Sequence, residues 1–513
     1  MSALAKGRFS FWLKIALVAA LVALADWTLV TPAGASAWLS VLGAAVVAAV
    51  GLAPAVRRRA WPWLVAALAL AAWQAETVSR IAAAFFCLAL AVAVLTPRAG
   101  AGQGVWTWTQ RLLVLATGLF RAPARAFAVL GHRRMKRRRG LPMKTILTTL
   151  ALPVIGGLVF LALFAAANPV LQDALSSVHG PRLEVARVVL WAILGLAAFA
   201  LLRPVSLRKP IPLPAARTDA RLPGVTTASV TLSLVVFNAL FALQNGLDIA
   251  FLWSGARLPD DYTLAEYAHR GAYPLIVTAL LAGLFVLVAL APGSETSRRP
   301  LVRALVVLWV AQNVFLVASS IQRTLLYIDS YSLTQLRLAA LAWMALVAVG
   351  LVLICWRLLA NRSAAWLINA NAACAAAVLL AFAVVDSGEI AADWNLRHAF
   401  EADGTGVELD PGYIKRLGPS ALVPLARIEQ TRLSPRYQAL VTALRWEAVE
   451  HTRAEQQRRR FTWRNHRRLA EADAILAAGR PELRAWRPSC RCDPPPIAPV
   501  IVPPQETPHD PAR

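Results

Sequence analysis

Long apolar runs alternate with short polar connectors through the first three quarters of the chain. A helix that spans a bilayer needs about 20 mainly apolar residues, and about eleven runs approach this length. They cover residues 11–30, 37–56, 60–76, 80–96, 146–168, 185–203, 226–248, 272–291, 301–320, 338–357 and 366–385. The third and fourth runs are the weakest, because both are short and only a brief polar segment separates them. The pattern predicts an all-α fold, a polytopic bundle of transmembrane helices.

The first apolar run is expected to stay in the mature protein as a spanning helix. It is long enough to cross a bilayer, and no small-residue cleavage pattern clearly follows a short apolar core. The run therefore differs from a cleavable signal peptide.

After residue 386 the periodicity changes to that of amphipathic, solvent-exposed helices. Asp410 and Pro411 suit an N-cap and a first helical position, and Ser434 with Pro435 repeats that signal before a longer helix. The apolar face of this longer helix is formed by Tyr437, Leu440, Val441 and Leu444. The pattern predicts a small helical domain outside the bilayer.

These patterns divide the chain into five segments. Residues 1–96 hold the first four spanning helices, and residues 97–145 form a basic connector. Residues 146–385 hold the remaining seven helices. Residues 386–483 form the extramembrane helical domain, and the Pro-rich residues 484–513 are expected to be disordered.

Composition supports a membrane protein and locates its charge. The chain is 58% hydrophobic and 16% charged, and its formal net charge is +25. Residues 1–385 contain 34 Lys and Arg against 11 Asp and Glu, whereas residues 386–513 contain 19 against 17. The positive excess therefore lies in the short connectors of the membrane part. This distribution favours cytoplasmic retention of Lys and Arg and disfavours nucleic-acid binding as a function.

Alternate connectors are rich and poor in Lys and Arg, which predicts the orientation of the chain. The rich connectors include Arg57–Arg59, the segment 97–145 and Arg298–Arg303, whereas the opposite ones hold only one or two Arg each. This places the N-terminus in the cytoplasm of a bacterium. An odd number of spans then places the C-terminal domain in the periplasm, outside the inner membrane.

The connector at 97–145 predicts contact with lipid headgroups. Residues 106–130 are apolar but interrupted by arginines, which is typical of an amphipathic helix on the inner membrane surface. A basic run follows, formed by Arg133, Arg134, Lys136, Arg137, Arg138 and Arg139. Anionic lipid headgroups are the expected partner of this run, and a nucleic-acid arm is the less favoured alternative.

Polar side chains inside two apolar runs form the first candidate site. Asn238, Asn245 and Asp248 share one helical face, and Gln312 and Arg323 form a matching stripe in the run at 301–320 and just beyond it. Arg323 can pair with Asp248, or with Asp329 in the following turn. Intramembrane polar groups face a cavity or another helix, so the stripe indicates a transport pathway or a packing interface. The packing interpretation is the favoured one.

The connector before residue 272 supplies the second candidate site, at the predicted outer face. Asp260, Asp261, Glu266 and His269 are candidates for an enzyme that acts on lipid or cell-wall precursors. A single Glu-x-x-His pair is too little for a metal centre. Phosphate-loop, HExxH, GxSxG and CxxC motifs do not occur in the sequence. No catalytic residue, metal or cofactor is therefore expected.

Two cysteines near the C-terminus could form a disulfide. A bond between Cys490 and Cys492 would be strained, and an intermolecular bond or two free thiols remain open. We expect two thiols in a loose tail. A protein partner at the periplasmic domain is a further expectation.

Several short motifs resemble those of known bacterial multi-pass membrane proteins. The residues that carry the resemblance are Glu266, Tyr267 and Gly271, then Tyr327, Tyr331, Leu333, Thr334 and Arg337, then Asn395 and Arg397. The chain is similar over about residues 150–430 to domain-of-unknown-function families 4153 and 4173. Ser332 stands where glycine is common in these families, and Tyr273 replaces a bulkier segment. The resemblance implies a topology and does not imply an activity.

Together these patterns predict an inner-membrane protein with a non-enzymatic sensory, regulatory or assembly role. A secondary transporter and a membrane enzyme at the periplasmic face are the alternatives. The candidate outer-face patch comprises Asp260, Asp261, Glu266, Tyr267, His269, Tyr327, Asp329, Tyr331 and Arg337.

Overall fold

The structure is a computed structural model of the 513-residue chain. It describes residues 3–30, 36–99, 103–135, 185–205, 210–212, 226–254, 281, 299–404, 406–457 and 461–479. Within these ranges the regular secondary structure is helical, apart from one isolated bridge that pairs Ala399 with Val407. The predicted all-α fold is confirmed.

The chain folds into two compact units. Unit 1 is formed by residues 1–78 and 82–212, and unit 2 by residues 79–81 and 213–513.

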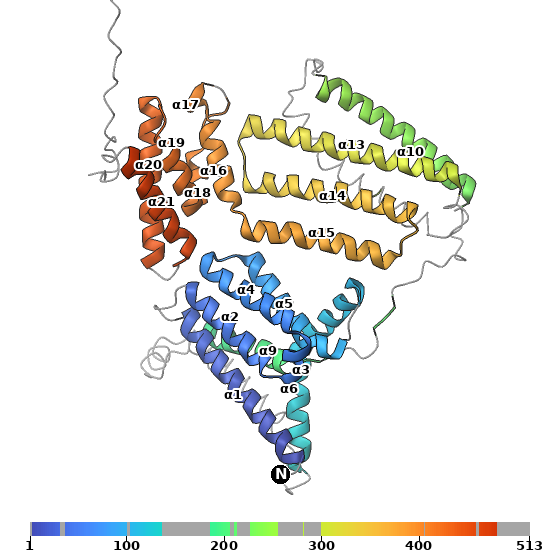
Figure 1. The fold of residues 1–513 in the computed structure, drawn as a ribbon, viewed down its shortest axis with the longest axis vertical. Coiled ribbons are helices and arrows are strands. Elements are labelled where there is room, and N and C mark those ends of the chain that lie inside the picture. The colour runs from blue at the N-terminus through green and yellow to red at the C-terminus, as the bar shows by residue number, and fades with distance from the viewer. Residues whose placement is uncertain are drawn as a thin grey trace, which may run out of the picture. The chain divides into compact units, whose positions relative to one another are not determined.

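Unit 1 is an assembly of apolar helices. Its described helices are α1 (Ala3–Val30), α2 (Ser36–Gly51), α3 (Pro54–Arg59), α4 (Trp61–Glu76), α5 (Arg80–Ala99), α6 (Val105–Met135) and α9 (Val185–Leu202) (Figure 1). α2 packs along α4, and α9 packs along both α1 and α6. A Cβ added at Gly43 of α2 would lie 2.7 Å from the Cβ of Ala71, which shows how closely α2 approaches α4.

The membrane part of unit 2 is a row of long helices. They are α10 (Thr227–Asp248), the π-helical turn η1 (Ile249–Trp253), α13 (Pro300–Tyr331), α14 (Gln335–Leu359) and α15 (Ala364–Val384). Figure 1 shows these helices side by side. Their core is apolar and includes Val230, Val306, Trp309, Met344 and Leu351.

The second part of unit 2 is a small helical domain that begins directly after α15. Its elements are α16 (Ser387–Arg397), α17 (Phe400–Asp403), α18 (Pro411–Leu417), η2 (Gly418–Ala421), α19 (Leu422–Ile428), α20 (Pro435–Gln457) and α21 (Trp463–Gly479). Asp410 caps α18 by accepting a 2.9 Å bond from the Tyr413 backbone, and Pro411 is its first residue. Tyr437, Val441 and Leu444 of α20 are buried in the core of this domain. The predicted capping and apolar face are confirmed.

Six described helices are long and apolar enough to cross a membrane. They cover Phe11–Leu29, Arg80–Ala99, Thr227–Trp253, Pro300–Tyr331, Gln335–Leu359 and Ala364–Val384. Trp38–Gly51 and Arg187–Leu202 are shorter apolar helices. A polytopic helical membrane protein is therefore confirmed, whereas the count of eleven spans stays a prediction.

Among the helix boundaries that differ from the sequence prediction, those of α2 and α13 are the clearest. The run at 37–56 was predicted as one helix, but α2 ends at Gly51 and α3 begins at Pro54. Proline lacks the backbone donor that would continue α2, so the chain restarts there. In addition, α13 continues to Tyr331, well beyond the predicted end at residue 320. The predicted helix at 146–168 and the Pro-rich tail lie outside the described residues. The predicted helix at 272–291 does so too, apart from residue 281, which is helical.

Candidate functional site

The predicted polar stripe forms a continuous seam between α10 and α13. Asn238 donates through Nδ2 to the carbonyl of Leu305 at 3.1 Å and accepts at Oδ1 from the Gln312 side chain at 2.7 Å. Two turns further along α10, Asn245 donates to the carbonyl of Gln312 at 3.2 Å. The structure thus brings these predicted residues together, and their hydrogen bonds join the two helices.

An ion pair lies at the end of the seam. Arg323 Nη2 donates to Asp248 Oδ1, and the two side chains are 3% and 0% exposed. Gln244 also donates to the same carboxylate oxygen at 3.0 Å. Asp329, the alternative partner considered for Arg323, is instead exposed. Removing one member of such a pair leaves a buried charge, which costs about 3–5 kcal/mol.

The contacts of the seam show the relative direction of α10 and α13. Asn238 faces residue 305, Asn245 faces residue 312, and Trp253 Nε1 donates to Ser319 Oγ at 3.2 Å. The contacts advance together along α10 and α13, so the two helices run parallel and begin on the same side. A single return span between them, as predicted for residues 272–291, is consistent with this arrangement.

A π-helical turn places the last contact of the seam. η1 follows Asp248 directly, and it brings Trp253 against α13, where its ring stacks on Phe315 with centroids 5.9 Å apart. π-turns inside α-helices occur frequently at functional sites. The apolar sequence of this turn, IAFLW, carries no signal that distinguishes it from ordinary helix.

The corner between α13 and α14 holds the motif residues of the outer-face patch that the structure describes. Arg337 donates through Nη1 to the carbonyls of Tyr331, at 2.5 Å, and Ser332. Its guanidinium also lies 4.5 Å from the centroid of the Tyr327 ring, and Thr334 caps α14 by accepting from the Arg337 backbone. Arg337 therefore closes the C-terminal end of α13, whose carbonyls lack helical partners.

The extramembrane domain is bonded to this corner. Asn395 of α16 accepts from the Leu333 backbone at 2.7 Å and donates to the Leu333 carbonyl at 2.9 Å. The Tyr413 hydroxyl of α18 accepts from the Gln335 backbone at 2.9 Å. A Cβ added at Gly388 would lie 2.9 Å from the Gln335 side chain, so α16 approaches the corner closely. We call the contacts of Asn395, Tyr413 and Gly388 with this corner the joint.

Ser332 sits in a backbone conformation that glycine adopts more easily. Its φ is 68° and its ψ is 165°, a combination almost restricted to glycine. The resemblance to the two families predicted glycine at this position. Ser332 therefore holds a strained backbone in the corner where glycine would be unstrained.

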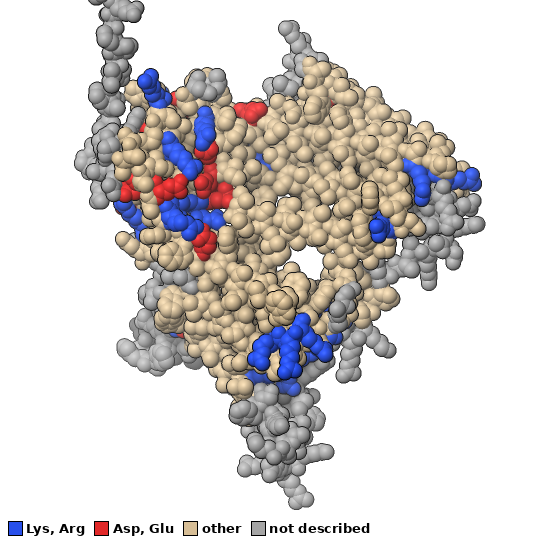
Figure 2. Space-filling model, in the orientation of Figure 1, with Lys and Arg blue, Asp and Glu red and all other residues tan. Residues whose placement is uncertain are grey.

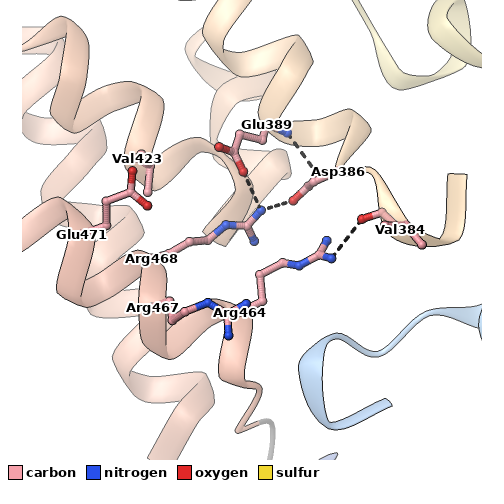
Figure 3. Close-up of a pocket in the computed structure, with 8 residues that line it drawn as sticks. All are labelled: Val384, Asp386, Glu389, Val423, Arg464, Arg467, Arg468 and Glu471. Carbon is pink, nitrogen blue, oxygen red and sulfur yellow. Dashed lines mark hydrogen bonds and ion pairs between the residues drawn. The ribbon is translucent and has the colours of Figure 1, made fainter. Parts of the chain in front are cut away.

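A charged pocket lies where α21 meets the end of α15. Figure 3 shows Arg468 of α21 pointing at Asp386, and Arg464 donating to the Val384 carbonyl at 3.0 Å. The pocket has a volume of about 250 Å³, and Arg468 also bonds Glu389 at 3.1 Å. These contacts tie the last helix of the domain to the last spanning helix.

Asp386 is a titratable group of this pocket with a shifted pKa. Burial alone would raise the pKa of its carboxyl. The charge of Arg468 and hydrogen bonds from Arg468, Ser420 and the Glu389 backbone outweigh burial, so the pKa lies below its ordinary value of 3.8. Asp386 also accepts from the Gly388 backbone at 2.8 Å and thereby caps α16.

Unit 1 has its own polar contact between helices. Arg187 of α9 donates through Nε to Asp26 of α1 at 2.7 Å, and Trp191 donates to the same carboxylate oxygen at 2.8 Å. The pair fixes α1 against α9. It resembles the seam of unit 2 in type, since a carboxylate on one helix meets a cation on another.

Several predicted site residues fall outside the described part of the chain. They are Asp260, Asp261, Glu266, Tyr267, His269, Lys136, Arg137, Arg138 and Arg139, together with Cys490 and Cys492. Arg133 and Arg134 lie within α6, but their side chains are not described. Among the described residues no group of His, Cys, Asp and Glu could hold a metal ion.

Sequence reasoning missed the joint and the pocket as sites. Asn395 and Leu333 are predicted only as residues that carry the family resemblance, and Asp410 and Pro411 only as the start of a helix. Neither Tyr413 nor Arg468 is predicted as a site residue. The signal available was Asp386, a carboxylate directly after an apolar run and two residues before glycine, which is typical of a helix N-cap. Nothing in the sequence links Arg468 to it.

The fold and these sites define a polytopic helical membrane protein with a helical extramembrane domain bonded to one corner of its bundle. Residues 63–428 match the family described as "Domain of unknown function (DUF4153)". The match covers well over half of the chain, so the protein belongs to this family. Comparison with curated proteins and with solved structures finds no match.

Proposed function

We propose that this protein has a non-enzymatic sensory, regulatory or assembly role in the bacterial inner membrane. In this role the extramembrane domain either signals the conformation of the spanning helices or is held in position by them. The observation that carries the proposal is the joint, because Asn395 and Tyr413 bond the backbone between α13 and α14 directly. A change in the tilt of α13 or α14 would therefore move α16 and α18.

The joint is continuous with the seam through one helix. α13 carries Gln312 and Arg323 of the seam, and the corner begins where α13 ends at Tyr331. A stimulus that alters the packing of α10 on α13 would act on the same rigid element that holds the domain. A movement of the extramembrane domain has an effect only if a protein partner binds there, so this mechanism requires such a partner.

The orientation follows the charge distribution. The N-terminus is cytoplasmic, the domain is periplasmic, and the basic run at residues 133–139 contacts anionic lipid headgroups. The periplasmic assignment depends on an odd number of spans.

Complementation of a deletion strain tests the proposed role. Asn395→Ala removes both bonds to Leu333, and Arg397→Gln on the same helix is the matched control, because Arg397 is exposed and bonds only its neighbour Asp393 at 2.9 Å among the described residues. Asn395→Ala at normal protein level is expected to lose complementation, whereas Arg397→Gln keeps it. Full complementation by Asn395→Ala, with the domain shown by limited proteolysis to be released, would refute the proposal.

A secondary transporter is the second candidate, and one observation favours it. The amide oxygens of Asn245, Gln312 and Asn313 are buried and accept no hydrogen bond from the described residues. Such acceptors suit a cation or water inside the seam. Uptake of a screened solute by reconstituted vesicles tests this hypothesis. Asp248→Asn and Arg323→Gln are expected to change the uptake at equal protein content. Unchanged uptake would refute the transporter hypothesis.

A further inference from the structure

Basic side chains from several helices of unit 1 converge on the C-terminal end of α5. Arg59 donates through Nη1 to the Pro97 carbonyl at 3.3 Å, and Arg111 donates through Nη2 to the Ala99 carbonyl at 3.4 Å. Arg98 lies in the same turn. Figure 2 shows blue side chains gathered on this unit, over the region of α3.

Two more cations reach this end from α1 and from the segment after α9. Lys14 is half-buried, and its charge interacts with those of Arg203 and Arg98. The guanidinium of Arg203 lies 5.9 Å from the centroid of the Phe11 ring. We call Lys14, Arg98, Arg111 and Arg203 the basic cluster.

No carboxylate among the described residues of unit 1 offsets the basic cluster. Asp26 and Glu76 are the acidic residues of the described part. Asp26 is bonded to Arg187, and Glu76 ends α4 at the opposite end from Arg59. The carbonyls at the end of α5 carry only about half a negative charge, which cannot neutralise several cations.

Arg111 adds a buried guanidinium in which two of the three nitrogens lack acceptors in the described part of the chain. Its side chain is 4% exposed, and its Nε and Nη1 have no hydrogen-bond partner among the described residues. A buried guanidinium without acceptors is costly, because all five of its N–H groups are donors. An acidic ligand oxygen beside α5 would remove this cost.

The surface beside the basic cluster is apolar. Trp12 is 60% exposed and Leu13 is 46% exposed, and both precede Lys14 on α1. A ligand that joins a negative group to long apolar chains matches both surfaces, whereas a free anion matches only the cations.

We propose that the basic cluster of unit 1 binds the phosphate of one anionic phospholipid, whose acyl chains lie along the apolar helices next to it. Lys14 and Arg203 supply charge, and Arg111 supplies donors to the phosphate oxygens. This site is made of other residues than the basic run at residues 133–139 and does not depend on the role proposed above.

Lipid binding by the purified full-length chain tests the site. The probe is dioleoylphosphatidylglycerol added to protein in neutral detergent, with native mass spectrometry as the readout. The double variant Lys14→Gln/Arg203→Gln is expected to bind about 30-fold more weakly, since each cation near a lipid surface contributes about a factor of five. The variant Lys14→Arg/Arg203→Lys should bind as the wild type does.

The control removes the same charge elsewhere. Arg397→Gln/Arg416→Gln changes two exposed cations of the extramembrane domain and should leave binding unchanged. Equal binding by the Lys14→Gln/Arg203→Gln variant would overturn the site. Equal binding of phosphatidylcholine, or full competition by millimolar inorganic phosphate, would overturn the assignment to an anionic lipid. A thermal unfolding curve on each variant verifies that it is folded.

Discussion

Asn395 shows how one side chain can connect two parts of a membrane protein. Its amide has both a donor and an acceptor, and both are used on the backbone of Leu333. The peptide groups around Leu333 follow the end of α13, where helical partners are lacking, so the side chain satisfies them. Aspartate could accept but not donate, and leucine could do neither. Asparagine therefore suits position 395, because it pairs with both backbone groups of Leu333.

Ser332→Gly is expected to stabilise the protein. The conformation at φ 68° and ψ 165° strains any residue with a Cβ, and glycine removes that strain. We predict a gain of about 1 kcal/mol in the free energy of unfolding, seen as a higher thermal midpoint. Ser330→Gly, two residues earlier within α13, is the control and should lower the midpoint. A lower midpoint for Ser332→Gly would contradict this account of the corner.

Asp386 should make the contact between α21 and α15 sensitive to acid. A carboxyl whose pKa is lowered in the folded state stabilises that state above its ordinary pKa, and this contribution is lost as the pH falls through the lowered value. The thermal midpoint is expected to fall below about pH 3.8 as Asp386 is protonated. Asp386→Asn should show a flatter dependence over the same range. Identical curves for the two proteins would refute this role.

At the scale of elements, α13 connects the seam to the joint. It packs on α10 through the polar seam and through apolar side chains, and on α14 through the same apolar core. It ends in the corner that holds the extramembrane domain. A helix of 32 residues is longer than a bilayer requires, so its last turns are available for the corner. The extra length is thus part of the site.

Assembly should depend on the two charges of the seam matching each other, rather than on either charge alone. Asp248→Asn alone leaves Arg323 buried without its counter-charge, and we expect a loss of about 3–5 kcal/mol, visible as a low yield of folded protein. Replacing both, as Asp248→Leu/Arg323→Leu, removes both charges and should recover much of the yield. Fluorescence-detected size exclusion measures this. A double variant as poor as Asp248→Asn would contradict the pairing.

The sequence predicted the positions of the long apolar helices that the structure describes, the shared face of the seam and the caps of α18 and α20. Apolar length and helical spacing are local properties, so they can be read from neighbouring residues. The choice of Asp248 over Asp329 as the partner of Arg323, and the contact of Asn395 with Leu333, depend on helices distant in sequence. The burial of Arg111 could not be predicted for the same reason, because the helix that carries it was expected to lie on the membrane surface.

At the scale of the whole molecule, the same type of contact joins helices in both units. In each, apolar helices are fixed to one another by a carboxylate and a cation: Asp26 with Arg187 in unit 1, and Asp248 with Arg323 in unit 2. Lipid offers no hydrophobic force between helices, so polar contacts and close packing must select their partners. Unit 2 adds a helical domain, and the family match extends from unit 1 into that domain.

The orientation of the domain is open to a direct test. A reporter that is active only in the periplasm, fused after residue 513 of the intact chain, is expected to be active, because an odd number of spans follows a cytoplasmic N-terminus. The same reporter inserted in the basic connector after residue 135 should be inactive. An inactive C-terminal fusion at normal protein level would overturn the odd count.

The central claim is that the extramembrane domain is bonded to the corner between α13 and α14, and hydrogen exchange in lipid nanodiscs tests it most directly. The backbone amides of Leu333 and Gln335 donate to Asn395 and Tyr413, so the peptide that contains them should exchange slowly in the wild-type protein. Asn395→Ala should accelerate exchange at Leu333, whereas Arg397→Gln should not. Rapid exchange of both amides in the wild-type protein would contradict the joint.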